Sequence, residues 1–460
     1  MKIIIAGAGA VGTYLARMLS NDRQDVVLID ADENRLARIG NELDIMTLVR
    51  NPTSLSGLRD AEVHKANLFI AVTPNESENL TCAMLAKQLG AKQTVARVDN
   101  YEYMKPENLE LFKNMGIESL IYPELLAAED IKASARYSWV RQMWEFNNGE
   151  LLLLSVKMHD MNPIYEKEIS NKNNQLVGHT LKEIGIAHGH NFHVVAIKRD
   201  GETISPHGDE KILPRDLVFF MTLKENLAEI RHLTGKDDYP AVKNSLLIGG
   251  GKLSVRASWK LASIHDSVKI IEPDSKRTEE LQSLVSPQTM ILEGEGYDVD
   301  LLNDEGYGST EALIALTAND QQNILACVAA RRRGIRKTIA QVENIDYFDM
   351  ANDLDIGTII NKKMIAASHI YRMLLKGDVD NVKMLTIGNA DVAEFVVKPD
   401  SKVTKKKVMD LCLPYGVNIG GMSRDGKSML VNGPTQLQAG DKVVVFCTDN
   451  TLKKLDKFFK

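Results

Sequence analysis

Two glycine-rich hexapeptides carry the most specific chemistry in this sequence, because their spacing is that of a turn that binds phosphate groups. The first follows a short apolar run and consists of Gly7, Ala8, Gly9, Ala10, Val11 and Gly12. Gly7 allows a tight turn out of a strand, Gly9 lets the backbone approach a pyrophosphate, and Gly12 lets the next helix pack against the sheet. The free amides at the start of that helix face the phosphates. The pattern predicts a dinucleotide-binding turn.

An acidic residue stands where such a site needs one. Asp30 lies 23 positions after Gly7 (30 − 7) and follows the apolar run 26–29. A carboxylate at this place accepts hydrogen bonds from both ribose hydroxyls of a dinucleotide and repels a 2′-phosphate. The sequence therefore favours NAD over NADP as the ligand.

The second hexapeptide repeats this arrangement later in the chain. It consists of Gly249, Gly250, Gly251, Lys252, Leu253 and Ser254. Glu272 follows Gly249 by the same 23 positions (272 − 249). Ser254 stands in the place of the third glycine, so the helix must pack in a looser or shifted way. The second hexapeptide is compatible with a second ligand site and with a structural turn that binds nothing.

The elements that position these turns are repeated as well. The apolar run 68–72 ends at Thr73, and the run 312–316 ends at Thr317. Arg97 follows Thr73 by 24 positions (97 − 73), and Gln341 follows Thr317 by 24 (341 − 317). The runs are continuous rather than alternating, which is typical of parallel strands buried on both faces. Each half predicts an α/β domain of the Rossmann kind with a doubly wound parallel sheet.

A smaller α+β domain is expected after each Rossmann domain. Arg199-Asp200-Gly201 and Arg424-Asp425-Gly426 stand between apolar runs, which predicts hairpins. Asp216 follows Arg199, and Asp441 follows Arg424, at the same distance of 17 positions (216 − 199 and 441 − 424). The predicted organisation is a Rossmann domain (1–122), a crossover helix (123–140), a small domain (141–232), a linker (233–243), a second Rossmann domain (244–361), a second crossover helix (362–381) and a second small domain (382–460).

Composition excludes several classes of function. The 460 residues carry a formal charge of −6, which argues against general nucleic-acid binding. The four cysteines are scattered without metal-ligand spacing, which fits a reducing cytosol. No apolar run reaches the roughly 20 residues that a membrane-spanning helix needs. His188, His190 and His193 are close in sequence but lack further ligands, so we interpret them as solvated loop residues and expect no metal site.

The chain also lacks the residues of a catalytic centre. A dehydrogenase needs a domain that presents an acid or a base to the nicotinamide, and the small domains show no such constellation. We therefore expect a protein that is not an enzyme. One alternative stays open at this point: an NAD-dependent oxidoreductase, which would change NADH absorbance when given its substrate.

These motifs resemble the TrkA family, the cytosolic NAD-binding regulatory subunits of Trk-type potassium uptake systems. The resemblance covers the whole chain, including the duplication and both small domains, and depends on the residues Gly7 to Gly12, Asp30, Ile70 to Thr73, Glu76 to Asn79, and Ala96 to Val98. The family's Rossmann domains are called RCK-N or TrkA-N domains, and its small domains RCK-C or TrkA-C domains. The resemblance implies dimers and a tetrameric ring on the inner face of the cell membrane. It also implies a channel partner of the TrkH or TrkG type and binding of NAD(H), with ATP and ADP as further candidates. An RCK-type regulator of another potassium transporter stays open as a second alternative.

The resemblance also implies the residues of each site. In the first half, the phosphates are held by Gly7 through Val11 and the adenosine ribose by Asp30, with further contacts from Asn51, Thr73, Pro74 and Arg97. In the second half, the corresponding residues are Gly249 through Leu253, Glu272 and Thr317. Arg50, before Asn51, replaces a glycine of the family, and Gln341 replaces the arginine equivalent to Arg97. The first site is therefore expected to be the principal sensor.

Overall fold

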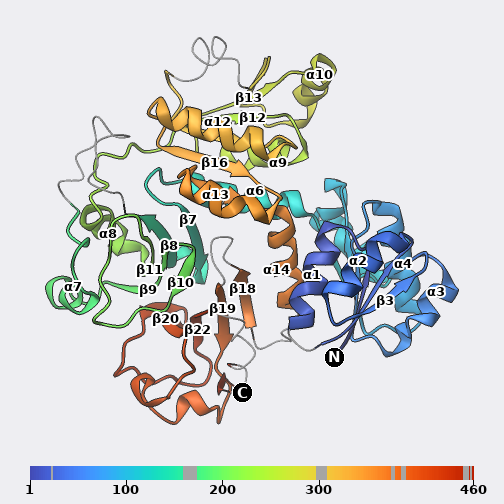
Figure 1. Ribbon diagram of the computed structural model, residues 1–460, viewed down its shortest axis with the longest axis horizontal. Helices are drawn as coiled ribbons and strands as arrows, with labels where there is room; N and C mark the ends of the chain where they lie inside the picture. The colour runs from blue at the N-terminus through green and yellow to red at the C-terminus, as the bar shows by residue number, and fades with distance from the viewer. Residues whose placement is uncertain are drawn as a thin grey trace. The chain divides into compact units, whose positions relative to one another are not determined.

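The computed structural model divides the chain into two compact units. It describes residues 1–21, 24–158, 174–296, 308–374, 379–384, 390–448, 455 and 458–459. One unit comprises residues Met1–Leu126 with Lys362–Lys376, and the other comprises Ala127–Asn361 with Gly377–Lys460. Figure 1 labels the elements of both.

The first Rossmann domain contains a six-stranded parallel sheet with the strand order β3-β2-β1-β4-β5-β6. Its strands are β1 (Lys2–Ala6), β2 (Asp25–Asp30), β3 (Met46–Val49), β4 (Leu68–Ala71), β5 (Gln93–Arg97) and β6 (Ser119–Ile121). Its helices are α1 (Ala10–Asn21), α2 (Glu33–Glu42), α3 (Leu55–Asp60), α4 (Glu76–Gln88) and α5 (Pro106–Asn114). Asp32, Ser54 and Asn75 cap α2, α3 and α4 by accepting a backbone N–H, which explains where these helices begin.

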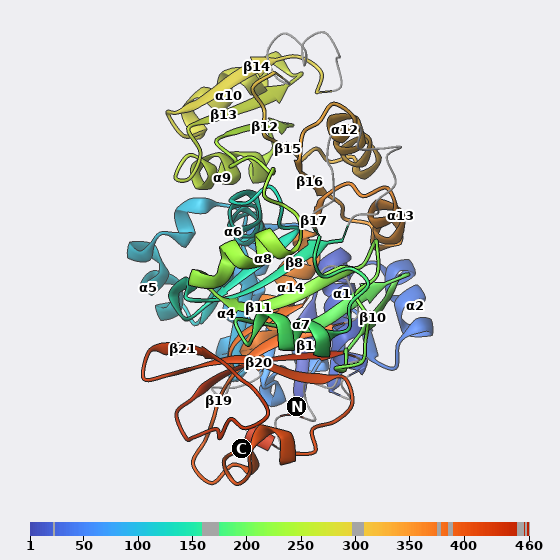
Figure 2. The same ribbon diagram turned by 90° about the vertical axis from the view of Figure 1, so that its left-hand side faces the viewer.

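The second Rossmann domain has the equivalent strand order, β14-β13-β12-β15-β16-β17, and every neighbouring pair is parallel (Figure 2). Its strands are β12 (Asn244–Ile248), β13 (Ser267–Glu272), β14 (Thr289–Glu293), β15 (Ala312–Ala315), β16 (Lys337–Gln341) and β17 (Thr358–Ile360). Its helices are α9 (Lys252–Leu261), α10 (Ser275–Leu284), α12 (Asp320–Arg332) and α13 (Phe348–Asp353). The order is that of a Rossmann fold, so the predicted fold class is confirmed for both halves.

Both small domains contain a five-stranded sheet whose neighbouring strands are antiparallel. The first, ordered β10-β9-β11-β8-β7, contains β7 (Gln142–Phe146), β8 (Leu151–Lys157), β9 (Phe192–Arg199), β10 (Glu202–Ile204) and β11 (Leu217–Leu223), with α7 (Leu181–His188) and α8 (Leu227–Leu233). The second, ordered β18-β19-β22-β20-β21, contains β18 (Val379–Met384), β19 (Ala390–Val396), β20 (Val417–Arg424), β21 (Lys427–Leu430) and β22 (Lys442–Thr448). The Asp-Gly pairs at 200–201 and 425–426 form the turns of the expected hairpins, and all four residues have positive φ.

The equal spacing of 17 positions marks a buried ion pair in each small domain. The Arg199 guanidinium donates to both carboxylate oxygens of Asp216, at 2.9 and 2.8 Å. Arg424 donates to both oxygens of Asp441 in the same way, at 2.7 and 2.7 Å. Both aspartates are buried, and each also accepts a backbone N–H, from Leu213 and Gln438 respectively. These pairs therefore fasten each hairpin to the neighbouring strand.

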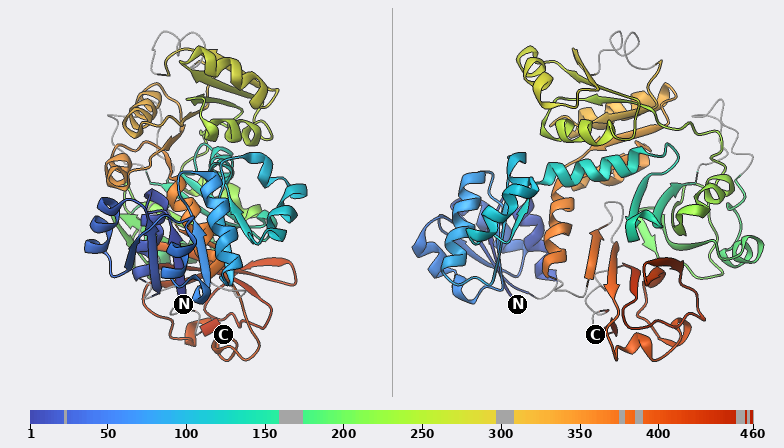
Figure 3. Two further views of the ribbon diagram at one scale, coloured as in Figure 1. Left: turned by 90° about the vertical axis from the view of Figure 1, so that its right-hand side faces the viewer. Right: turned by 180° about the vertical axis from the view of Figure 1, so that it is seen from behind.

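The two small domains lie side by side (Figure 3) and share a hydrophobic core. Phe219 of the first lies with its ring centroid 6.1 Å from that of Phe446 in the second, and it stacks on Trp144. Gly420 and Gly421 allow close contact, because a Cβ at Gly420 would lie 3.0 Å from Met221 Cγ. The tandem domains thus bury apolar surface against each other.

Two expectations need correction at the crossover segments and the histidines. The first crossover helix, α6 (Pro123–Ala135), and the second, α14 (Lys362–Leu374), are both shorter than predicted. The second cannot reach residue 381, because β18 begins at Val379. Helix α14 packs against α1 within the first unit, where Lys362 pairs with Glu124 at 3.2 Å. Of the histidines interpreted as loop residues, His188 ends α7 and His193 lies half-buried in β9, where burial lowers its pKa.

Candidate functional site

The first glycine-rich turn has the backbone geometry that its sequence predicts. Gly7 has a φ of +107°, and a Cβ there would lie 2.8 Å from the Thr73 backbone nitrogen. A Cβ at Gly12 would overlap the Gly7 carbonyl oxygen, so only glycine lets α1 begin this close to the turn. A Cβ at Gly9 would have no atom within 4 Å. The backbone at Gly9 is therefore open to a ligand.

Asp30 lies at the carboxyl end of β2 and already faces this turn. Its carboxylate accepts the Ala8 N–H at 2.6 Å and the Asp32 N–H at 2.9 Å. Arg35 on α2, which the sequence analysis missed, places Nη1 3.5 Å from the same carboxylate. The repeat contained a signal for it, since Arg277 stands at the matching place in the second half.

The remaining predicted residues of the first site follow the carboxyl ends of neighbouring strands. Asn51 comes after β3, Thr73 and Pro74 come after β4, and Arg97 ends β5. In a doubly wound sheet this edge is where ligands bind. The Asn51 amide oxygen accepts hydrogen bonds from the backbone and side chain of Thr53, so it shapes the local turn.

A buried asparagine joins these strand ends, and it too was missed as a site residue. Asn79 Oδ1 accepts the Thr73 N–H at 2.7 Å, and Asn79 Nδ2 donates to the carbonyls of Thr73 and Arg97, each at 3.0 Å. Asn323 makes the equivalent bonds to Thr317 and Gln341 in the second half. The equal spacing of six residues from each threonine was the available signal. This amide fixes the separation of two strands at the ligand edge.

Arg97 ends β5 with part of its guanidinium unpaired. Its Nη2 donates to Asp99 at 3.1 Å, whereas its Nε is buried and has no hydrogen-bond partner. A buried donor left unpaired is unfavourable unless another group accepts its proton. Gln341, at the matching end of β16, is buried and neutral. The two sites therefore differ in charge at this point.

The second glycine-rich turn repeats the geometry of the first. Gly249 has a φ of +94°, and Gly250 donates its N–H to Glu272 Oε2 at 2.6 Å. Arg277 donates its Nε to the Gly250 carbonyl at 2.9 Å. Ser254 lies fully buried, with its hydroxyl oxygen unpaired. The turn thus keeps its shape despite the serine, at the cost of an unsatisfied hydroxyl.

A cavity of about 270 Å³ opens at this second turn. Five of the predicted residues line it: Gly249, Gly250, Gly251, Glu272 and Thr317. Lys252 and Leu253 do not line it; Lys252 begins α9, and Leu253 is a buried residue of the same helix. The volume is close to the lower end of the range typical of small-molecule sites, about 300 Å³. The second half therefore offers space beside its carboxylate.

The chain matches two family models in the same alternating order as its domains. The TrkA-N domain model matches residues 3–123 and 245–362, which together form more than half of the chain. The chain belongs to the TrkA-N family. The TrkA-C domain model matches residues 168–235 and 392–460, so each TrkA-N domain is followed by a TrkA-C domain.

Relatives of full length carry the same arrangement. "Trk system potassium uptake protein TrkA" of Haemophilus influenzae is 28% identical over all of this chain and 99% of that protein. The protein of the same name from Halomonas elongata is 28% identical with the same coverage. The "Trk system potassium uptake protein TrkA homolog" of Archaeoglobus fulgidus is 26% identical over the full length of both chains.

Solved structures show the same fold. The GsuK RCK domain superposes with a TM-score of 0.59 and 15% identity, over all of this chain and 94% of that chain. The GsuK channel bound to NAD gives a TM-score of 0.58 and 15% identity, over all of this chain and 78% of that one. At this identity the likeness concerns the fold alone. Among the described residues, no helix combines the length and apolar character needed to cross a membrane.

Proposed function

We propose that this chain is the nucleotide-sensing regulatory subunit of a Trk-type potassium uptake system, and that it is not an enzyme. It binds NAD(H), with ATP and ADP as further ligands, and controls a membrane channel of the TrkH or TrkG type as a ring of several copies. The observation that carries this proposal is the pair of glycine-rich turns, each facing a carboxylate 2.6 Å from a turn amide. The names of the full-length relatives support the potassium uptake system.

The residues present fit such a ligand. The open backbone at Gly9 and Gly251 leaves room for phosphates, since a Cβ at either position would meet no atom within 4 Å. The backbone amides of each turn bind the phosphates, and Asp30 and Glu272 orient the ribose. NAD(H), ATP and ADP share these groups and differ at their distal ends. Arg97 lies at the strand end that faces this distal part, so its charge discriminates between them.

Regulation then follows from linkage. A ligand shifts a ring between two shapes only to the extent that it binds one shape more tightly than the other. Asn79 ties Thr73 to the Arg97 backbone, so a change of charge beside Arg97 is transmitted to two strand ends together. The change of charge beside Arg97 thereby alters the angle between neighbouring TrkA-N domains in the ring.

Calorimetric titration of the full chain with NADH, NAD+, ATP and ADP tests the proposal. Asp30→Ala and Glu272→Ala remove one ribose carboxylate each, and we expect each to weaken its own site about tenfold to a hundredfold. Glu107→Ala on α5 and Glu279→Ala on α10 are matched controls, because these carboxylates are exposed and make no hydrogen bond or ion pair to the turn residues that the structure describes. Equal losses in a variant and its control would contradict the assignment.

Absorbance at the NADH band separates the proposal from an oxidoreductase. We expect NADH to bind without being consumed when candidate substrates are added. Turnover would favour the enzyme instead. Co-purification with a TrkH-type channel subunit, reconstituted in vesicles, then tests the partner: potassium flux that changes with nucleotide in the wild type and not in Asp30→Ala supports the proposed regulation.

A further inference from the structure

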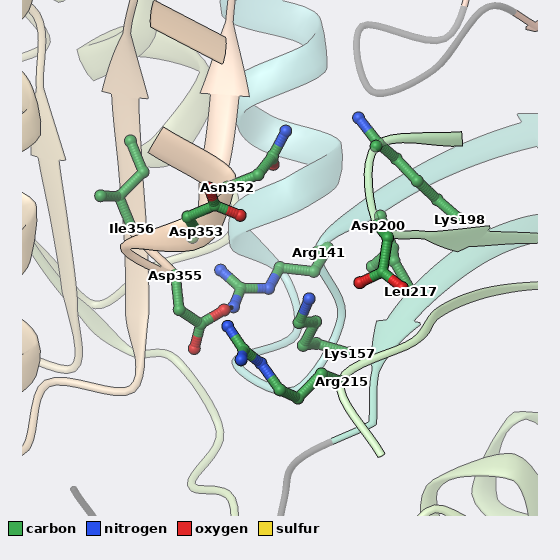
Figure 4. Close-up of a pocket in the computed structure, with 12 residues that line it drawn as sticks. Arg141, Lys157, Lys198, Asp200, Arg215, Leu217, Asn352, Asp353, Asp355 and Ile356 are labelled. Carbon is green, nitrogen blue, oxygen red and sulfur yellow. Dashed lines mark hydrogen bonds and ion pairs between the residues drawn. The ribbon is translucent and has the colours of Figure 1, made fainter. Parts of the chain in front are cut away.

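A second cavity lies away from both glycine-rich turns, between the second TrkA-N domain and the first small domain. It has a volume of about 410 Å³. Four basic side chains line it, Arg141, Lys157, Lys198 and Arg215, together with the carboxylates of Asp200, Asp353 and Asp355 (Figure 4). None of these residues belongs to the proposed nucleotide sites.

Three of the basic groups converge on one place. Figure 4 shows Arg141, Lys157 and Arg215 with their charged ends directed toward one another beside Asp355, whereas Lys198 extends away. Asp355 is already occupied, because it pairs with Arg141 and accepts from Arg331 Nη2 at 2.6 Å. One carboxylate thus serves two arginines, and the nearby Lys157 and Arg215 add two further positive charges.

The side chains of Lys157 and Arg215 form no hydrogen bond or ion pair with the residues that the structure describes. Burial lowers the pKa of Lys157 to about 8, and repulsion from Arg141 and Arg215 adds to the effect. Burial also lowers the pKa of Arg141 to about 9, with repulsion from Arg331. Cations that are held together at a free-energy cost are relieved when an anion enters between them.

The internal repeat shows that the fold does not require these cations. Lys157 pairs with Leu217 across the sheet, and the equivalent of Lys157 in the second small domain is Val396, which pairs with Lys442. Arg215, directly before Asp216, corresponds to Gly440 before Asp441. Both have positive φ, +69° and +90°, which glycine adopts without strain and arginine does not. The first small domain therefore keeps a strained, unpaired arginine where its copy has glycine.

We propose that this cavity binds a small anion with two or more phosphate groups, held by Arg141, Lys157 and Arg215. All three cations belong to the first small domain, so the ligand would neutralise charge on that domain, beside Asp353 and Asp355 of the second TrkA-N domain. The residues lining the cavity include no aromatic side chain on which a base could stack. A non-nucleotide diphosphate therefore fits the lining better than a nucleotide does.

Pyrophosphate is the probe, and its binding at the glycine-rich turns must be blocked first. Gly9→Asp with Gly251→Asp does this, because each new carboxylate enters open space and repels phosphate. In this background we expect calorimetry to detect one pyrophosphate site per chain. Absence of binding would overturn the proposal, while the nucleotide-sensing function, measured on the wild type, would be unaffected.

Replacing residues of the cavity by their counterparts in the second small domain then locates the site. Lys157→Val and Arg215→Gly introduce residues that the equivalent positions already carry, and each should weaken pyrophosphate about tenfold to a hundredfold. Lys182→Gln, an exposed lysine on α7 of the same domain, should leave the affinity unchanged. Equal weakening in Lys182→Gln would contradict the assignment.

A variant that strengthens binding distinguishes loss of the site from loss of folding. Asp353→Asn removes an exposed carboxylate from the lining, and it should tighten pyrophosphate severalfold because repulsion falls. A misfolded chain cannot produce this gain. Titration with ADP in the same background tests whether the ligand is a nucleotide. Binding of pyrophosphate but not of ADP supports a non-nucleotide ligand. Tighter binding of ADP than of pyrophosphate overturns that part of the proposal.

Discussion

The two TrkA-N domains have the same backbone design but different side chains where a ligand's charge would be recognised. Each has the glycine turn, the carboxylate that accepts a turn amide, and the asparagine that joins two strand ends. The first half has Arg97 at a strand end, and the second has neutral Gln341. The two halves therefore share the hydrogen bonds that build the turn and differ in the residue that we propose to select a ligand.

The third position of the glycine turn gives the largest expected difference between the halves. Gly12→Ser places a Cβ on the Gly7 carbonyl, so we expect it to destabilise the first half by about 3 kcal/mol or more. Ser254→Ala only removes an unpaired buried hydroxyl and should be neutral or slightly stabilising. Thermal unfolding followed by calorimetry measures both. A Gly12→Ser protein as stable as the wild type would contradict the steric argument.

The ion pairs of the two small domains differ in one partner. Asp441→Ala leaves Arg424 without its buried carboxylate and should cost about 2 kcal/mol, whereas Asp216→Ala leaves Arg199 paired with Glu210 and should cost less. Urea unfolding of the two variants makes the comparison. Asp209→Ala, a change at an exposed aspartate of the first small domain, is the control and should alter stability little. Equal losses would show that Glu210 does not compensate for the loss of Asp216.

Lys157 should make stability depend on alkaline pH in the first small domain only. Its pKa is lowered to about 8 in the folded chain, against 10.5 for the ordinary lysine. The folded state therefore binds fewer protons between these values, and stability rises as pH increases from about 8 to 10.5. Lys157→Val should be more stable than the wild type at pH 7.5 by about 2 kcal/mol, with a smaller difference at pH 10. A constant difference across this range would contradict the prediction.

Exchanging the strand-end residues tests ligand selection. Arg97→Gln should weaken ADP at the first site about tenfold, since a charged donor is lost, and Gln341→Arg should strengthen ADP at the second by a similar factor. Titration in the Glu272→Ala or Asp30→Ala background isolates each site. Arg59→Gln, at an exposed arginine on α3, is the control for loss of charge. No change in either direction would show that selection lies elsewhere.

Much of the fold could be predicted because it depends on local patterns. The continuous apolar runs gave the parallel strands, and the Asp-Gly pairs gave the hairpins with both residues at positive φ. The end of the second crossover helix was not predicted, because Val379 already belongs to β18, whose place is fixed by its antiparallel pairing with β19. Arg35 and Asn79 were missed although the repeat carries their spacing, whereas Arg215 was missed because its neighbours Arg141 and Lys157 are far from it in the sequence. The roles of the site residues remain predictions.

Helix α14 gives the first TrkA-N domain an unusual dependence on the order of synthesis. The domain's own sheet is finished by residue 121, yet the helix that covers α1 begins at Lys362. At about 5 to 20 residues per second, a ribosome needs roughly 10 to 50 s to make the intervening chain. During that time the apolar side of α1 lacks its cover. The nascent protein is therefore exposed to chaperones and proteases for longer than a contiguous domain would be, and a truncated N-terminal half would keep that exposure permanently.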